Sequence, residues 1–233
     1  MRNIAIIPAR SGSKGLKDKN IKLLGGKHLL GYTVEAAFQA GVFDCVHVST
    51  DSEQYAQIAK AYGADVPFLR EEGLATDSAD TWDVLRAAVR HYEELGRSFD
   101  TVTLLQPTSP LRDAADICRA FEIFHDRQAD SVISVCEVEH SPRLCNTLGT
   151  NNSMQDFIDI QIIGRRQDLG VYYRLNGAIY IQKTEILMRR QTLYGEKSYA
   201  YIMDKIHSLD IDDAFDFFMA EAALDWMVKS TQE

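Results

Sequence analysis

Two aspartates near the end of the sequence have the spacing of a metal site. Asp210 and Asp212 alternate with Leu209 and Ile211, so in an extended strand both carboxylates would lie on one face, about 6–7 Å apart at Cα. Two carboxylates this close repel each other unless a cation lies between them. A hard cation such as Mg²⁺, shared with the phosphates of a substrate, is the expected ligand. An exposed edge strand or a helix N-cap is the competing interpretation.

A second set of polar residues follows the first apolar segment of the chain. Residues 3–9 form an apolar run that predicts a buried first strand, and Arg10-Ser11-Gly12-Ser13-Lys14-Gly15 follows it directly. The two glycines would let the backbone approach a ligand, with hydroxyls and cations beside it, as in a phosphate-binding loop. The segment is neither a Walker A loop nor a G-x-G-x-x-G fingerprint. Lys19 and Asn20 lie just beyond it.

The charge distribution favours a small polyanionic ligand. The 233-residue chain has a formal net charge of −9, which argues against a general nucleic-acid binder, because affinity for a phosphate backbone needs a surplus of Lys and Arg. One stretch reverses the sign, with Asp18 as its only acid and six cations: Arg10, Lys14, Lys17, Lys19, Lys22 and Lys27. A cationic island in an acidic protein is suited to binding a polyanionic small molecule.

Two further groups could orient an organic substrate. Gln106 ends the apolar run 101–105 and can both donate and accept hydrogen bonds, as a contact with a sugar hydroxyl or carboxylate requires. It could equally satisfy backbone groups in the proline-rich turn that follows. The guanidinium groups of Arg165, Arg166 and Arg174 could bind a carboxylate through two hydrogen bonds each. A solvated cluster of charges is the competing interpretation for these arginines.

The elements that must position these residues alternate between two-residue and 3.6-residue periods, which is typical of an α/β sheet. Strands are predicted at residues 3–9, 45–49, 66–69, 101–105, 131–135, 176–181, 199–203 and 209–212. Helices are predicted from residue 30 to a stop at Gly41, at 55–62, 82–92 and 114–125, and at the end of the chain, where one face carries Phe215, Phe218, Met219, Ala222 and Trp226. Ligands bind at the carboxyl ends of parallel strands, where Arg10, Asp51 and Gln106 fall.

The chain is expected to form one core with an inserted segment. Residues 1–136 and 174–233 carry the core pattern, whereas residues 137–173 weaken into polar residues and Asn-rich turns, and a long excursion of this kind is usually functional or contacts a partner. No apolar run of about 18 residues and no signal peptide are visible, so a cytoplasmic protein with no membrane contact is expected. Scattered cysteines and histidines predict neither a zinc site nor a disulfide framework.

Four motifs in a fixed order point to one family. They are Ile7–Leu16 with Lys19-Asn20, Leu104–Arg112, Asn176–Tyr180 and Asp210–Asp212. Together they resemble the bacterial acylneuraminate cytidylyltransferases, the CMP-sialic acid synthetases. The resemblance runs from the first strand to the last helix. It implies a Rossmann-like nucleotidyltransferase of three layers around a mostly parallel sheet, with residues 137–173 as an inserted dimerisation arm of a homodimer.

The resemblance also implies a reaction and a set of roles. CMP would be transferred from CTP to the anomeric hydroxyl of N-acetylneuraminic acid with release of pyrophosphate, and Arg10, Lys19, Gln106 and Asp212 would act on the reacting groups. The CTP phosphates and ribose would be bound by Arg10, Ser13, Lys14, Lys19 and Asn20, and the cytosine pocket would be lined by Arg70, Ala79 and Thr81. The sugar would be faced by Gln106, Tyr180, Tyr194 and, across the dimer, Arg166. Mg²⁺ would be held by Asp210 and Asp212.

Several alternatives remain open at this point. The acceptor could be legionaminic, pseudaminic or another nonulosonic acid, with the same reaction. Octulosonic acid (Kdo) activating enzymes resemble the chain less around residues 13–15 and 210–212, and a guanylyl-transferring relative would differ in the base pocket at residues 70–81. A non-catalytic nucleotide-sugar-binding protein could use the same fold, but it would not need the paired aspartates. A dehydrogenase is excluded because the dinucleotide fingerprint is missing.

Overall fold

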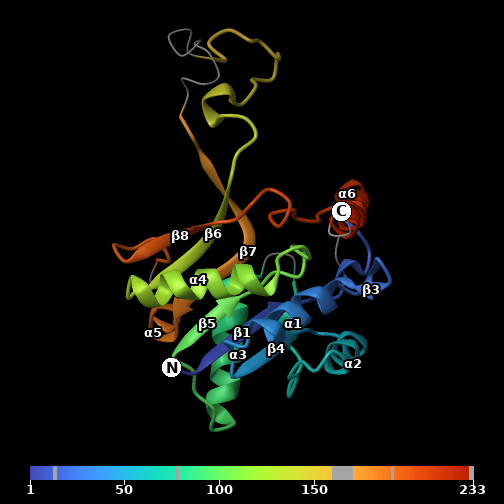
Figure 1. The fold of residues 1–233 in the computed structure, drawn as a ribbon, viewed down its shortest axis with the longest axis vertical. Coiled ribbons are helices and arrows are strands. Elements are labelled where there is room, and N and C mark those ends of the chain that lie inside the picture. The colour runs from blue at the N-terminus through green and yellow to red at the C-terminus, as the bar shows by residue number, and fades with distance from the viewer. Residues whose placement is uncertain (13–14, 77–78, 159–169, 190–191, 231–233) are drawn as a thin grey trace.

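A six-stranded sheet organises the molecule (Figure 1), in the order β4-β1-β5-β7-β6-β8. The computed structural model describes residues 1–12, 15–76, 79–158, 170–189 and 192–230. The strands of this sheet are β1 (Asn3–Pro8), β4 (Cys45–Ser49), β5 (Thr101–Leu104), β6 (Ser131–Glu137), β7 (Tyr173–Lys183) and β8 (Ser198–Ile202). β7 runs antiparallel to both of its neighbours, and the other pairs are parallel. The predicted mostly parallel sheet is therefore confirmed.

Helices cover both faces of the sheet and give the predicted three layers (Figure 1). One face carries α1 (Leu29–Ala40), α2 (Glu53–Ala61) and α4 (Ala114–Asp126), and the other carries α3 (Thr81–Glu94) and α5 (Thr184–Met188). Successive side chains of a strand point to opposite faces. In β1, Ala5 and Ile7 therefore join the first apolar cluster, whereas Ile4 and Ile6 join the second. Both faces are buried, which explains why the strand is a continuous apolar run.

Local signals fix the ends of the main helices. α1 ends at Gly41, whose φ of 65° is the left-handed conformation that glycine adopts without strain. Ser52 caps α2 by accepting a hydrogen bond from the Tyr55 amide at 3.4 Å, and Asp80 caps α3 by accepting one from the Trp82 amide at 3.0 Å. These caps fix where α2 and α3 begin, and Thr81 at the start of α3 lies on the same cavity as Pro8 of β1 and Gln106 after β5.

One predicted strand, residues 66–69, is wrong. The chain there makes a single bridge to β4, between His47 and Asp65, and then continues without regular structure. Pro67 has no amide hydrogen to donate to a ladder, so the pairing ends at the residue before Val66. Val66 is apolar because it is buried. A buried apolar residue need not lie in a strand, so the apolar pattern was misleading here.

A second predicted strand, residues 209–212, is also wrong. The segment has no ladder partner. Its central residue, Ile211, is fully buried and donates its amide hydrogen to the Thr108 carbonyl at 2.9 Å. The neighbouring chain at Gln106–Pro110 contains two prolines and cannot continue a ladder. A short antiparallel pair, β2 (Leu23–Leu24) and β3 (Lys27–His28), was not predicted.

The last helix, α6 (Ala214–Ser230), was predicted, but it does not pack through the expected face. Phe217 and Ala220 are buried against Leu24, Leu29 and Ile211. The expected apolar face, with Phe215, Phe218, Met219, Ala222 and Trp226, is exposed. The helix carries apolar residues all round, so its periodicity did not indicate which side meets the β2–β3 pair. In the described parts of the chain, no helix is long and apolar enough to cross a membrane.

The chain between β6 and β7 leaves the sheet and extends away from the core (Figure 1). The two strands stay paired as far as Glu137 and Tyr173. Beyond them the described residues 138–158 and 170–172 contain one short 3₁₀ helix, Pro142–Leu144. Several large apolar side chains on this excursion are exposed, among them Leu148, Met154 and Val171. The projecting segment therefore adds little to the core itself.

Candidate active site

A cavity of about 660 Å³ opens where β1, β4 and β5 end. Its walls contain nine of the predicted site residues: Arg10, Lys19, Asn20, Arg70, Ala79, Thr81, Gln106, Asp210 and Asp212. They come from five separate stretches of the sequence and converge because the carboxyl ends of the parallel strands meet at one edge of the sheet. Ser13, Lys14 and Arg166 lie outside the described residues.

The loop after β1 is anchored by an aspartate from the end of β4. Asp51 accepts hydrogen bonds from the Ser11 amide at 2.8 Å and the Ser11 hydroxyl at 2.6 Å. Burial opposes ionisation of this carboxyl, but the two bonds from Ser11, a bond from its own amide and the charge of Arg70 together hold the pKa of Asp51 below its ordinary value. The side chain of Asn20, which is buried, donates to the Arg10 carbonyl at 3.1 Å. The loop is thus fixed at both ends before any ligand binds.

Arg70 forms another wall of the cavity and is held by the end of β4. Its Nη2 donates to the Ser49 carbonyl at 2.7 Å and its Nε donates to the Ser49 hydroxyl at 3.2 Å. Burial lowers the pKa of Arg70 to about 10, so the group is still cationic at neutral pH. Ala79 and Thr81, at the start of α3, line the same cavity. This wall places a fixed cation beside small side chains.

The loop after β1 contacts the segment that carries the two aspartates. Lys19 Nζ donates to the Ile211 carbonyl at 2.6 Å and lies 3.3 Å from Asp212 Oδ1. A Cβ atom on Gly15 would lie 2.4 Å from the carbonyl oxygen of Asp212. Only glycine therefore allows the two backbones to approach this closely. The contact sets positive and negative groups side by side at the mouth of the cavity.

The paired aspartates have different environments, and together they fit a divalent cation. Asp210 is largely buried, and among the described residues its Oδ1 has no hydrogen-bond partner. Burial raises the pKa of Asp210, a hydrogen bond from Thr108 offsets part of this effect, and the charge of Asp212 adds to it. The Asp212 side chain is 82 % exposed. One buried oxygen without a partner and one accessible carboxylate are a suitable donor set for Mg²⁺.

Gln106 is positioned by residues whose role the sequence did not reveal. Arg112 is 1 % exposed, and its Nη1 donates to the carbonyls of Gln106 at 3.2 Å and Ala178 at 3.1 Å. A Cβ atom on Gly177, which has a φ of 78°, would lie 2.4 Å from Gln106 Oε1. In β7, residues 176–179 lie opposite the single β6 residue Ser134, and this irregularity lies where Gly177 meets the Gln106 side chain. Arg112 belongs to the motif Leu104–Arg112, but a single sequence contains no pattern from which its burial could be predicted.

The two predicted tyrosines do not line the main cavity. Tyr194 is exposed and lines a neighbouring hollow of about 330 Å³, which also contains Asp80, Trp82, Arg86, Gln182, Leu187, Thr192 and Leu193. Tyr180 is buried and packs edge-on against Trp82, with ring centroids 5.8 Å apart. Burial raises the pKa of Tyr180, and the charges of Tyr194 and Asp210 add to the effect. Tyr180 is therefore within electrostatic reach of both the hollow and the main cavity.

Gln182, which sequence reasoning missed, is an unusual member of this hollow. The side chain is 1 % exposed, and its Nε2 has no hydrogen-bond partner among the described residues. An unsatisfied buried amide costs free energy, about 1–3 kcal/mol, unless a ligand or water completes it. Gln182 therefore brings one unused donor to a hollow that also contains the apolar side chains of Leu187 and Leu193.

The chain matches one protein family over almost its whole length. The model of the cytidylyltransferase family matches residues 4–222 of the chain, so the chain belongs to the cytidylyltransferase family, as its motifs predicted. It is 42 % identical over 218 residues to an N-acylneuraminate cytidylyltransferase of Escherichia coli O18:K1:H7, which covers 93 % of this chain and 51 % of that protein. The chain thus spans about half the length of the first curated relatives that it matches.

Two shorter relatives match over nearly their whole length. A CMP-N,N'-diacetyllegionaminic acid synthase of Legionella pneumophila is 37 % identical, covering 97 % of each chain. A pseudaminic acid cytidylyltransferase of Campylobacter jejuni is 31 % identical, covering 95 % of each chain. The solved structure of a CMP:2-keto-3-deoxy-manno-octonic acid synthetase complexed with CTP superposes with a TM-score of 0.74 at 16 % identity, covering 97 % of this chain and all of that one. This last likeness establishes the fold alone.

Proposed function

We propose that the chain transfers CMP from CTP to the anomeric hydroxyl of N-acetylneuraminic acid and releases pyrophosphate, in a Mg²⁺-dependent reaction. The observation that carries the proposal is that one cavity joins the cationic loop after β1 to the paired carboxylates, through the contact of Lys19 with Asp212. The cationic loop would bind a triphosphate, and the paired carboxylates would bind a catalytic divalent cation. The name of the relative with 42 % identity supports the choice of sugar.

The walls of the cavity suit the parts of CTP. Arg10 and Lys19 would bind the phosphates together with Ser13 and Lys14, and Asn20 would hold the loop that carries them. Arg70, Ala79 and Thr81 would line the base pocket. Because negative charge spreads over the α-phosphate and the departing pyrophosphate, fixed cations and a fixed orientation supply most of the catalysis.

Asp210 and Asp212 would hold Mg²⁺, and their donor set fits this ion. When bound, the ion supplies neutralisation of phosphate charge. The chain's own contribution is to keep one carboxylate buried and the other accessible, with Lys19 beside them. The sugar hydroxyl attacks the α-phosphorus, a P–O bond forms to the sugar, and the bond to pyrophosphate breaks. The proton of the hydroxyl leaves to a base that the sequence did not indicate.

The sugar would lie between Gln106 and the two tyrosines, Tyr180 and Tyr194, with Arg166 contacting the carboxylate from a second copy. The unused amide donor of Gln182 and the apolar side chains of Leu187 and Leu193 suit an acylamino substituent, whose carbonyl accepts and whose methyl group is apolar. This feature also favours the alternative of legionaminic or pseudaminic acid, which the names of two relatives support.

A homodimer formed through the arm, residues 137–173, is part of the same proposal. Exposed apolar side chains on a projecting segment are typical of an interface, and Leu148, Met154 and Val171 provide them. Sedimentation of a variant in which a short turn replaces residues 138–172 tests this, because the proposal requires that this variant be a monomer.

A cytoplasmic location is also proposed, since nucleoside triphosphates are made there, and cell fractionation tests it.

The reaction is tested by following the product. Purified protein, CTP, Mg²⁺ and N-acetylneuraminate should give a CMP-sugar with a new phosphodiester signal in ³¹P NMR, and GTP, UTP or ATP should not replace CTP. Tight binding of CTP without turnover of any nonulosonic acid would instead favour the nucleotide-sugar-binding protein.

A further inference from the structure

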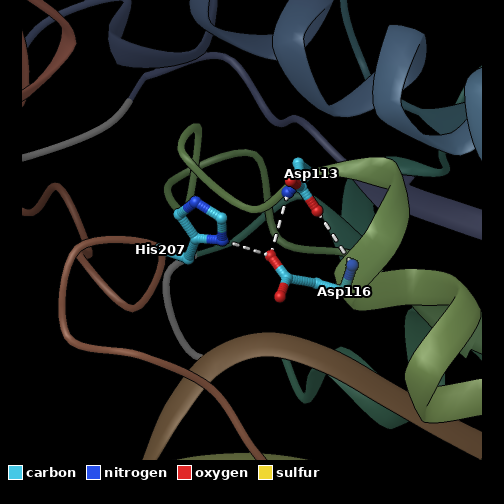
Figure 2. Close-up of side chains that lie close together, drawn as sticks. All are labelled: Asp113, Asp116 and His207. Atoms are coloured by element: carbon cyan, nitrogen blue, oxygen red, sulfur yellow. Dashed lines mark hydrogen bonds and ion pairs between the residues drawn. The ribbon is translucent and has the colours of Figure 1, made fainter. Parts of the chain in front are cut away.

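Three side chains outside the cavity form a compact hydrogen-bonded cluster. Asp113 and Asp116, at the start of α4, and His207, in the chain after β8, place their polar atoms within 4.8 Å of one another (Figure 2). Asp116 is 1 % exposed. Its Oδ2 accepts a hydrogen bond from His207 Nδ1 at 2.7 Å. A buried carboxylate with a histidine partner is a costly arrangement, so its contacts merit an explanation.

Both oxygens of the buried Asp116 carboxylate already accept hydrogen bonds, so the cluster does not have the character of a cation site. Asp116 Oδ1 accepts from the Tyr201 hydroxyl at 2.7 Å, and Oδ2 accepts from the Asp113 amide at 3.1 Å in addition to His207. Asp113 Oδ1 accepts from the Asp116 amide at 2.8 Å, which completes the capping box of α4. A cation would have to displace these bonds. The cluster therefore links α4 to β8 and to the segment of His207.

His207 belongs to a turn that is closed by its own side chains. Asp204 Oδ1 accepts from the amides of Ile206 at 2.8 Å and His207 at 2.9 Å. Ser208 Oγ donates to the Asp204 carbonyl at 2.5 Å and accepts from Asn176 Nδ2 at 2.9 Å. These bonds hold the turn together, and His207 links it to α4 through Asp116.

The two metal-site aspartates lie directly after this turn, next to a second anchor. Asp210 is three residues beyond His207, and the next residue, Ile211, donates its amide hydrogen to the Thr108 carbonyl. Thr108 and Asp116 belong to one stretch of chain, residues 106–116. The same stretch begins with Gln106 and contains Arg112, which binds the Gln106 carbonyl. One short stretch therefore contains Gln106, which is proposed to face the sugar, and two of the anchors of residues 207–212.

We propose that the Asp116–His207 pair is a positioning device that fixes residues 208–212, so that Asp210 and Asp212 face the cavity together. The proposal rests on the proposed function in that it treats these aspartates as the Mg²⁺ ligands. Residues that orient metal ligands typically change metal affinity 10–100-fold when they are replaced. The hydrogen bond to Asp116 raises the pKa of His207, and the charges of Asp116, Asp204 and Asp113 act in the same direction. The charged form of this link therefore persists to a higher pH than it would for a histidine with an ordinary pKa.

The test compares three histidine variants. His207→Ala removes the donor, His207→Asn retains a side-chain N–H close to the position of Nδ1, and His125→Ala removes an exposed histidine at the other end of α4. Hydrogen–deuterium exchange should show faster exchange of residues 203–213 in His207→Ala, with β1 and β5 unchanged. The Mg²⁺ concentration for half-maximal pyrophosphate release should rise roughly tenfold, with little change in the sugar KM. His207→Asn should recover most of both properties, and His125→Ala should match the wild type.

Several results would overturn the proposal. One is a folded His207→Ala variant with unchanged exchange at residues 203–213 and an unchanged Mg²⁺ requirement. Another is a His207→Asn variant whose exchange at residues 203–213 and Mg²⁺ requirement are the same as those of His207→Ala. If His207→Ala does not fold, Tyr201→Phe removes one bond to Asp116 and should shift exchange at residues 203–213 in the same direction, and no shift would contradict the link. A wild type that releases no pyrophosphate would refute the proposed function, while the exchange experiment would still decide the positioning claim.

Discussion

The cationic loop at residues 10–20 and the aspartate segment at residues 203–212 meet at one cavity, but they are held in different ways. The loop follows β1 directly, and side-chain bonds from Asp51, just after β4, and from Asn20 hold its first residues in place. The aspartate segment has no strand or helix of its own. Side-chain bonds to Asn176 and Asp116 fix it, together with the backbone bond from the Ile211 amide to the Thr108 carbonyl.

This difference suggests separate roles for the two regions in the proposed reaction. A loop at the end of a buried strand is rigid because the sheet is rigid, which suits a phosphate-binding surface that must not move. A segment held by a few side-chain bonds can be displaced by losing one of them. Changes in the first region should therefore act mainly on CTP binding, and changes in the second should act mainly on the metal requirement.

The largest effect is expected in the aspartate segment. Asp212→Asn keeps the size of the side chain but removes one negative charge from the cation site, so turnover should fall about a thousandfold. The Asp212 side chain is exposed, and the fold should therefore persist, as circular dichroism can check. Asp225→Asn on the exposed side of α6 is the matched control. Near-normal turnover of Asp212→Asn at every Mg²⁺ concentration would refute the metal assignment.

Loss of Lys19 should have the next largest effect and should act on the nucleotide. Lys19→Ala removes a cation at the mouth of the cavity, and kcat/KM for CTP should fall about a hundredfold, with a much smaller change in the sugar KM. Lys22→Ala, an exposed lysine in the next turn, should change neither constant. An unchanged KM for CTP combined with a raised KM for the sugar would show that Lys19 does not serve the phosphates.

A smaller effect is expected where the two regions touch. In Gly15→Ala the new methyl group would lie 2.4 Å from the Asp212 carbonyl oxygen, so the two backbones must separate. Both KM for CTP and the Mg²⁺ requirement should then rise, each by about tenfold or less. Gly73→Ala, whose methyl group meets open space, serves as the control. A change in only one of the two constants would mean that the regions are not coupled through this contact.

The smallest effect concerns stability and pH. The pKa of His207 is raised above its ordinary value of 6.5, mainly by its hydrogen bond to Asp116, so its contribution to the free energy of unfolding is fully present below pH 6.5 and is lost as pH rises through the raised pKa. The pKa of Asp116 is lowered from 3.8, because bonds from His207 and Tyr201 outweigh its burial, so its contribution is lost only in strong acid. Urea unfolding should show that the free energies of unfolding of the wild type and His207→Asn differ more at pH 6 than at pH 9. A difference independent of pH would contradict this.

The sequence predicted the first region better than the second for a physical reason. Arg10, Asp51 and Gln106 follow buried strands, and an apolar run ending in polar residues is visible in one sequence. Residues 209–212 were predicted as a strand because apolar and acidic residues alternate, although Ile211 alone is buried and no ladder forms. Asp116, His207 and Arg112 act through bonds to residues far away in the chain, and such bonds leave no periodic pattern. The packed side of α6 was missed because both sides are apolar.

The most direct test of the central claim is pyrophosphate release with CTP and Mg²⁺, compared across N-acetylneuraminic, legionaminic, pseudaminic and Kdo acids. The claim is that the cationic loop and the paired aspartates form one active site for CMP transfer to a nine-carbon acid. We expect turnover that requires both CTP and Mg²⁺ and is fastest with N-acetylneuraminate. Fastest turnover with legionaminic or pseudaminic acid would keep the mechanism and change the acceptor. Absence of pyrophosphate release with all four acids, from protein that binds CTP, would contradict the claim.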